Sequence, residues 1–138
     1  MSVAEVWDVR RTLELRTAEL AAAHRSEADA DEIARCADAM AAAGDDLPEV
    51  TRHDIRFHQA IARAGGNALF LQIIRSFEPL MTVAVPTAWR TRVTPEQRHA
   101  ILEQHHLIAE AIRRGDPDAS AQAMGEHFDA SIGDLFAR

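Results

Sequence analysis

Apolar residues recur at spacings of three and four along almost the whole of this 138-residue chain. That period is typical of amphipathic α-helices, and no segment alternates apolar and polar residues as a half-buried strand would. Short connections between long helices favour antiparallel neighbours. The pattern therefore predicts an all-α fold, an antiparallel bundle of about six helices that forms one domain over residues 1–138.

Capping signals divide the pattern into helices. Ser26 and Thr94 are each followed three residues later by a side chain that completes a capping box, and Pro86 is expected to end a helix because proline lacks a backbone N–H. Residues 86–93 are then the one real loop. The six helices are expected from Val3 to Ala23, from Ser26 to Gly44, from Pro48 to Gly65, from Asn67 to Val85, from Thr94 to Gly115, and from Asp116 onward.

Composition narrows the class of protein. No run of 18 apolar residues is present, so no membrane span is predicted, and the N-terminus lacks the pattern of a signal peptide. The single cysteine, Cys36, excludes an internal disulfide and a multi-thiolate zinc site. We therefore expect a cytoplasmic protein. The net charge of −7, with arginines scattered among carboxylates, argues against DNA binding by these residues.

Polar side chains interrupt the apolar stripes of three predicted helices. In the third helix, Asp54 occupies a position where an apolar residue is expected, and His58 lies one turn later on the same face. His105 stands in the middle of the stripe of the fifth helix, and His127 lies beside Phe128 in the sixth. Three helices are therefore expected to direct imidazole or carboxylate groups inward.

Buried carboxylates and imidazoles are costly unless they are paired or bind a metal ion. Facing helices of a bundle commonly form carboxylate–histidine metal sites. We predict that Asp54, His58, His105 and His127 bind a divalent transition metal, with zinc preferred and nickel, iron or manganese as alternatives. The competing interpretation is a buried hydrogen-bond network of these side chains without an ion. An open metal position would also accept an oxygen of an organic carboxylate.

The first predicted helix carries a further candidate. Arg10 lies inside its inward stripe, and Glu14 follows one turn later. One interpretation is an ion pair within the helix. The other is that Arg10 faces a cavity and binds an anionic effector through its planar guanidinium, with Glu14 holding it in place. The remaining histidines are expected to be structural or solvated: His24, His53, His99 and His106.

At these residues the chain resembles the FCD domain, the C-terminal effector-binding domain of GntR-type transcription regulators of the FadR branch, and in particular its metal-binding members. The resemblance extends from about Val6 to Phe128 with four blocks in register. The blocks are Val9–Glu14 with Ala21–Ala23, Asp54–His58 with Ile61-Ala62 and Gly66-Asn67, Glu103–His105 with Ile108, Ala111-Ile112 and Gly115-Asp116, and Ala119 with Ala123-Met124 and His127.

The resemblance implies a helical bundle with an internal effector pocket, in which the same four residues hold the metal. The spacing to Ala111-Ile112 selects His105 rather than His106 as the ligand of the third block. Family effectors are mostly small organic acids and sugar acids, which touch the metal and an arginine that matches Arg10 by position. The family usually forms homodimers. Its winged helix-turn-helix domain is not found in these residues, so DNA contact is expected only through a separate domain.

Two other classes of function compete with an effector sensor. A metal site of three histidines and one aspartate could serve a metal-dependent enzyme, because metal-bound water can hydrolyse esters. No separate general base is apparent beyond the four ligands, since Glu103 would point away from His105. We therefore do not expect an enzyme. A metal-free helical dimerisation module is the third possibility, and it would need an interior without metal at these four positions.

Overall fold

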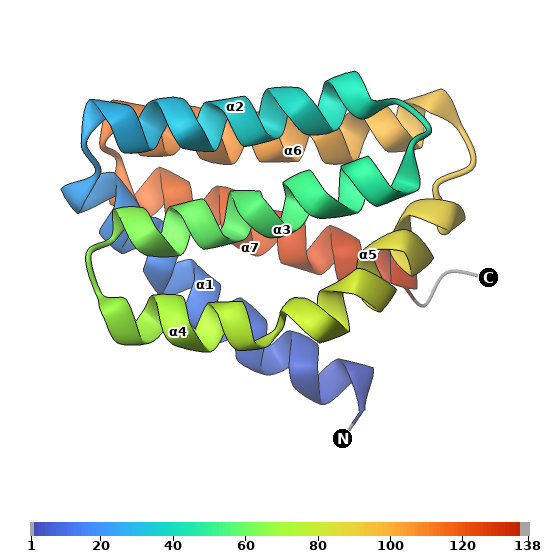
Figure 1. The fold of residues 1–138 in the computed structure, drawn as a ribbon, viewed down its shortest axis with the longest axis horizontal. Coiled ribbons are helices and arrows are strands. Elements are labelled where there is room, and N and C mark those ends of the chain that lie inside the picture. The colour runs from blue at the N-terminus through green and yellow to red at the C-terminus, as the bar shows by residue number, and fades with distance from the viewer. Residues whose placement is uncertain (1, 136–138) are drawn as a thin grey trace.

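The structure of the protein is a computed structural model that describes residues 2–135. It confirms the predicted all-α bundle, with seven helices and no strand among these residues (Figure 1). The helices are α1 (Val3–His24), α2 (Glu27–Ala43), α3 (Leu47–Ala64), α4 (Ala68–Ser76), α5 (Glu78–Thr91), α6 (Pro95–Arg114) and α7 (Pro117–Leu135).

The capping signals act as the sequence predicts. The Ser26 hydroxyl accepts a hydrogen bond from the Asp29 amide at 3.0 Å, and the Asp29 carboxylate accepts one from the Ser26 amide. Thr94 and Gln97 form the equivalent capping box at the start of α6. Each box satisfies amide groups that a helix N-terminus leaves without an intrahelical partner. These caps fix where α2 and α6 begin.

The predicted fourth helix differs from the structure in two ways. It breaks at Phe77, giving α4 and α5 a mutual bend of 58°, and Pro79 then occupies the first turn of α5, where proline is well tolerated. The expectation that Pro86 ends the helix is wrong, because α5 continues to Thr91. Pro86 cannot donate to the Thr82 carbonyl, but Thr82 is exposed, so water can hydrate that oxygen. The expected loop shrinks to residues 92–94.

The helices pack as an antiparallel stack around one main core. α2 and α6 lie side by side along one edge, α3 and α7 run through the middle, and α1 and α4 lie on the other side (Figure 1). The core includes Phe57, Ile61, Ile108 and Phe128, all nearly inaccessible to solvent. The four predicted metal ligands belong to α3, α6 and α7, so they come from the centre of this stack.

No single helix within residues 2–135 is both long enough and apolar enough to cross a membrane. Taken together, α4 and α5 reach that length and composition, but they meet at the sharp bend described above.

Candidate metal centre

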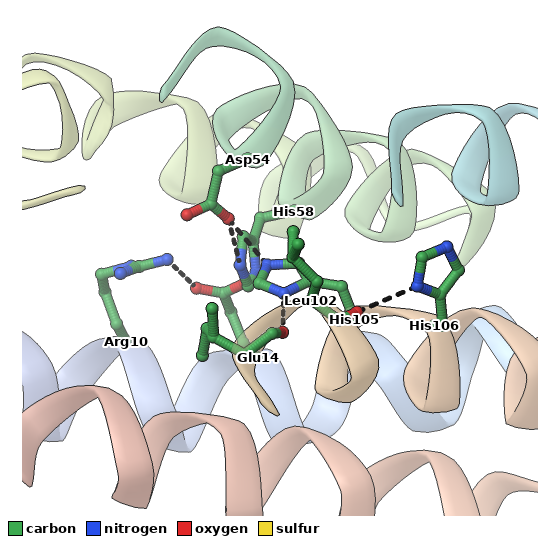
Figure 2. A network of polar contacts seen from close by, with 8 residues as sticks. Arg10, Glu14, Asp54, His58, Leu102, His105 and His106 are labelled. Carbon is green, nitrogen blue, oxygen red and sulfur yellow. Dashed lines mark hydrogen bonds and ion pairs between the residues drawn. The ribbon is translucent and has the colours of Figure 1, made fainter. Parts of the chain in front are cut away.

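The structure brings the four predicted ligands together. One ligand atom from each of Asp54, His58, His105 and His127 lies within 4.8 Å of the other three. All three imidazoles are buried, and Asp54 is nearly so. Asp54, His58 and His105 converge between α3 and α6 (Figure 2). Residues separated by up to 73 positions therefore form one compact cluster of metal-ligand side chains.

Helix geometry positions the Asp54–His58 half of the cluster. The two residues are one turn apart on α3, and the Nε2 atom of His58 lies 3.2 Å from Oδ1 of Asp54. The same carboxylate oxygen lies 3.1 Å from Nε2 of His105 on α6. One oxygen therefore faces two imidazole nitrogens from different helices.

The ring of His105 is oriented by its own helix. Its Nδ1 atom lies 2.8 Å from the Ile101 carbonyl oxygen, which can only accept a hydrogen bond, so Nδ1 carries a hydrogen. A neutral imidazole has a hydrogen on one nitrogen only. The Nε2 atom of neutral His105 then presents a lone pair to the Asp54 carboxylate. That arrangement is unfavourable unless a proton or a metal ion lies between the two atoms.

Glu14 extends the cluster onto α1. Its carboxylate contacts Nδ1 of His58, and its other oxygen lies 2.7 Å from Nη2 of Arg10 (Figure 2). Both Glu14 and Arg10 are buried. The structure thus contains the Arg10–Glu14 ion pair, which was one of the two interpretations of Arg10 from sequence. It also shows a contact that sequence reasoning missed, since Glu14 orients a predicted metal ligand 44 positions away.

The charged groups shift one another's pKa values. Burial opposes ionisation of Asp54, but hydrogen bonds from His105 and His58 hold its pKa well below the usual range. Burial likewise disfavours the Glu14 anion, yet Arg10 and His58 lower its pKa. Burial disfavours protonated His58, but the Glu14 charge and hydrogen bonds with Asp54 and Glu14 raise its pKa to about 9. Both carboxylates are therefore ionised at neutral pH, and a cation is favoured between them.

His127 differs from the other two imidazoles. Burial, together with the neighbouring His105 and His58 charges, lowers the pKa of His127 well below its usual value. Its Nδ1 atom is buried and has no hydrogen-bond partner among the described residues. The ring packs at 4.5 Å from His105 and at 5.4 Å from His58, centroid to centroid. His127 is thus held as a neutral imidazole, the protonation state that binds metal ions.

Aromatic side chains surround the cluster. The Phe57 ring lies 4.9 Å from the His105 ring, and the Phe128 ring lies 5.5 Å from His127. The Arg10 guanidinium stacks 5.0 Å from the Trp7 ring and 4.9 Å from Phe128. These apolar walls exclude water and strengthen every electrostatic interaction inside them.

Two small cavities flank the cluster. One of about 10 Å³ is lined by Asp54, His58 and Arg10 together with α4 and α5 residues. The other, of about 20 Å³, is lined by the same three residues and also by Trp7 and His127. Arg10 therefore faces both cavities, as the effector-binding interpretation requires.

The other histidines examined by sequence stand apart from this cluster. His106 contacts Asp38 of α2 through Nε2 at 2.9 Å, and Figure 2 shows its ring apart from Asp54, His58 and His105, beside the Leu102 carbonyl. His53 lies 3.3 Å from the exposed Glu49 carboxylate. Both positions agree with a structural or solvated role.

Comparison with known proteins identifies the family to which this arrangement belongs. The family model of the FCD domain matches residues 5–130. The chain belongs to the FCD domain family. The resemblance inferred from the four sequence blocks is therefore confirmed.

Curated relatives of this FCD domain are regulators. A protein of Escherichia coli K12 named for regulation of the L-lactate dehydrogenase operon is 31% identical over 124 residues, which are 89% of this chain and 47% of that protein. The HTH-type transcriptional repressor NanR of Escherichia coli K12 is 27% identical over 128 residues, 93% of this chain and 48% of the repressor. These names agree with the expectation of a regulator rather than an enzyme. The chain spans about half the length of these relatives.

A solved structure shares the fold. McbR/YncC of E. coli superposes with a TM-score of 0.83 at 18% sequence identity, over 97% of this chain and 64% of the McbR/YncC chain. The bundle described above is thus an established architecture.

Proposed function

We propose that this FCD domain is the effector-sensing module of a GntR-type transcription regulator, and that it binds a divalent metal ion and a small organic acid. The main support for a metal site is the arrangement of nitrogen atoms around the Asp54 carboxylate. Its carboxylate faces Nε2 of both His58 and His105, while the opposite nitrogen of each ring already contacts another oxygen. A metal ion between these atoms would satisfy all of them.

The donor set fits a transition metal by size as well as by chemistry. Ligand atoms around a tetrahedral zinc ion with bonds near 2.0–2.1 Å lie about 3.3–3.4 Å apart. The two nitrogen–oxygen separations at Asp54 are 3.1 and 3.2 Å, close to that edge length. The unpartnered Nδ1 of buried His127 adds a third nitrogen whose hydrogen-bonding capacity is unused. Asp54, His58, His105 and His127 would hold the ion.

Zinc is the ion we expect, because three imidazoles and one carboxylate match its preferences without requiring a thiolate. Nickel, iron and manganese accept the same ligands. When bound, the ion would supply a positive centre that attracts a carboxylate oxygen of the effector.

Arg10 supports the assignment of an acidic effector. Its guanidinium is buried, lines both cavities beside the cluster, and has its Nε–H without an acceptor among the described residues. Glu14 holds one side of the guanidinium, which leaves the other side for a ligand. A small organic acid or sugar acid would provide the missing oxygen.

Regulation would follow from packing. An effector in these small cavities displaces α5, which contributes Met81 and Val85 to their walls. In a homodimeric regulator, that displacement would reposition a winged-helix domain and so change DNA binding. A ligand shifts such an equilibrium only by its different affinities for the two states.

This proposal can be tested by measuring whether small organic acids raise the melting temperature of the protein when it is loaded with zinc. We expect zinc-loaded protein to gain several degrees in melting temperature with millimolar hydroxy acids or sugar acids, and Arg10→Gln to lose that gain while keeping its zinc. Zinc loading without any stabilisation across such a panel would contradict the effector role. Dimerisation without zinc or acid binding would favour the metal-free module instead.

A further inference from the structure

Trp7 forms part of the wall between the metal centre and solvent. Its side chain lines the cavity of about 20 Å³ beside Asp54, His58 and His127. It also lines a wider surface groove of about 440 Å³ between α1 and α5. Ala84 on α5 is the other residue common to both spaces. The indole therefore stands between an open groove and the metal ligands.

The indole N–H of Trp7 lacks a hydrogen-bond partner. The Nε1 atom is buried and has no acceptor within residues 2–135, and the same is true of Nε of Arg10, one helical turn later. Buried donors without partners are rare in native proteins, and an unplaced ligand is one explanation. Two such donors on one face of α1, both lining one cavity, indicate a ligand with more than one oxygen acceptor.

We propose that Trp7 is a specificity-determining residue of the effector site. Its N–H donates a hydrogen bond to a second oxygen function, a hydroxyl or a further carboxylate, of a small acid whose first carboxylate lies at the metal and Arg10. This inference rests on the proposed function and adds to it the residue, Trp7, that distinguishes acids with an oxygen beyond the first carboxylate from simple alkanoates.

The remaining polar lining of the cavity agrees with an oxygen-rich ligand. Arg92 and the hydroxyl-bearing Ser131 line the same cavity, and both are buried. The α5 side of the cavity is apolar, with Met81, Val85 and Ala88. The cavity is therefore lined by both polar and apolar side chains, as a small oxygen-bearing acid requires.

Space for such an acid comes from the neighbouring groove. The inner cavity holds little more than one water molecule, whereas the groove beyond Trp7 is more than twenty times larger. A rotation of the indole, or a small outward movement of α5, joins the two spaces at Trp7 and Ala84. Trp7 thus moves when the acid binds, and its fluorescence reports the event.

Trp89 provides a matched control in the same chain. It is also buried with an unpartnered Nε1 atom. It packs with Met40, Val50 and Ile101 in a separate apolar cluster and lines neither cavity at the metal centre. Trp89 contacts the cavity only indirectly, through Ile101 and through Arg92, whose guanidinium lies 5.6 Å from its ring. Loss of its N–H therefore removes a chemically identical group that does not line the ligand site.

The experiment compares two probe acids on zinc-loaded protein. Calorimetric titration with 2-hydroxypropanoate and with propanoate measures the contribution of the extra oxygen in wild type, Trp7→Phe and Trp89→Phe. We expect wild type and Trp89→Phe to bind the hydroxy acid about five- to tenfold more tightly than propanoate, the effect of one hydrogen bond. Trp7→Phe should lose this preference and bind the two acids about equally tightly, whatever its affinity for propanoate.

A second readout does not require the Trp7 variant to fold. In Trp89→Phe, Trp7 is the only tryptophan, and 2-hydroxypropanoate should shift its emission to longer wavelength while propanoate should not. An unchanged preference in Trp7→Phe, or no difference between the two acids in emission, would overturn the role of Trp7 alone. Failure of zinc-loaded wild type to bind either acid would overturn the proposed function together with this inference.

Discussion

Two regions of the bundle meet at the metal centre, and they are built differently. The ligand-bearing half (α1, α2, α3, α6 and α7) supplies all four candidate ligands and the Arg10–Glu14 pair, and its core positions such as Phe57 and Ile108 are completely buried. The α4–α5 arm has one buried residue in α4, and its Leu69 and Val83 side chains are 63% and 69% exposed. The first region is densely packed, whereas α4 is mostly exposed and α5 buries only one face, at Met81, Val85, Ala88 and Trp89.

The polar groups of the site follow the same division. Two of the four candidate ligands are oriented by a further group of the ligand-bearing half, His58 by Glu14 and His105 by the Ile101 carbonyl. The arm contributes mainly apolar side chains to the two cavities, with Glu78 as its one charged residue. The candidate ligands and their charged partners thus come from one region, and the other covers them mainly with apolar side chains.

Removal of a buried ring from the ligand-bearing half should reduce the free energy of unfolding more than any other change proposed below. Phe57→Ala removes a ring that contacts both His58 and His105 and should lower the free energy of unfolding by about 3–5 kcal/mol. Phe77→Ala, at the half-buried junction of α4 and α5, should cost less than about half of that. Chemical denaturation measures both. Equal losses would remove the distinction between the two regions.

Removal of the Glu14 charge should produce the next largest change. Glu14→Gln leaves the Arg10 cation buried without its partner, which should destabilise the fold by about 3 kcal/mol. It also removes the carboxylate that orients His58, so zinc affinity should fall about 10- to 100-fold.

Glu19→Gln is the control for this change. Glu19 is also on α1, but it is partly exposed and lies 3.8 Å from Arg16, so its loss should cost less than about 1 kcal/mol. Zinc affinity equal to wild type in Glu14→Gln would show that Glu14 does not support the ligand set.

The arm can also be strengthened. Pro86 lies inside α5, so Pro86→Ala restores an amide that can donate to the Thr82 carbonyl and should raise stability by about 1 kcal/mol. Pro95→Ala at the start of α6 should have the opposite sign, costing about 0.5 kcal/mol, because proline suits a first helical turn and restricts the unfolded chain. Thermal unfolding of both variants tests whether Pro86→Ala raises the melting temperature and Pro95→Ala lowers it. A destabilised Pro86→Ala would mean that the arm needs its proline.

The last of these predictions concerns the chemical reactivity of Cys36 and involves no change in the stability of the fold. Cys36 in α2 is 4% exposed, and burial, with the Glu32 charge, raises its pKa to about 11. Since the thiolate is the reactive form, its alkylation at pH 8 should be slow and should keep increasing with pH beyond 9.

A cysteine placed at Val83, in a chain that also carries Cys36→Ser, should instead react rapidly at pH 8 because that arm position is exposed. Rapid alkylation of Cys36 in the folded protein at pH 8 would show that the ligand-bearing half often unfolds locally and exposes its core.

The sequence was sufficient for much of this fold, and its failures have physical causes. Ser26 and Thr94 mark helix starts through contacts three residues away, and such local contacts are visible in sequence. The break at Phe77 depends on the packing of α4 and α5, although Pro79 was a usable signal for a new helix start. The prediction that Pro86 ends a helix was wrong because a proline inside a helix costs less free energy where the carbonyl that it leaves unpaired, here that of Thr82, can be hydrated.

The site shows the same limit. Asp54 and His105 could be found because each places a polar group in an apolar stripe of its own helix. The contact of Glu14 with His58 could not be found, because it joins α1 to α3 and depends on how the two helices cross. The unpartnered N–H of Trp7 is invisible in sequence for the same reason.

The zinc content of three proteins after zinc loading and dialysis, measured by elemental mass spectrometry, tests most directly whether Asp54, His58, His105 and His127 bind a metal ion. We predict about one ion per chain in wild type and in His106→Ala, and none in His105→Ala, because the His106 ring contacts Asp38 of α2 and is not part of the ligand cluster. Wild type without metal, or His105→Ala that retains it, would contradict the account and leave the four side chains as a buried hydrogen-bond network.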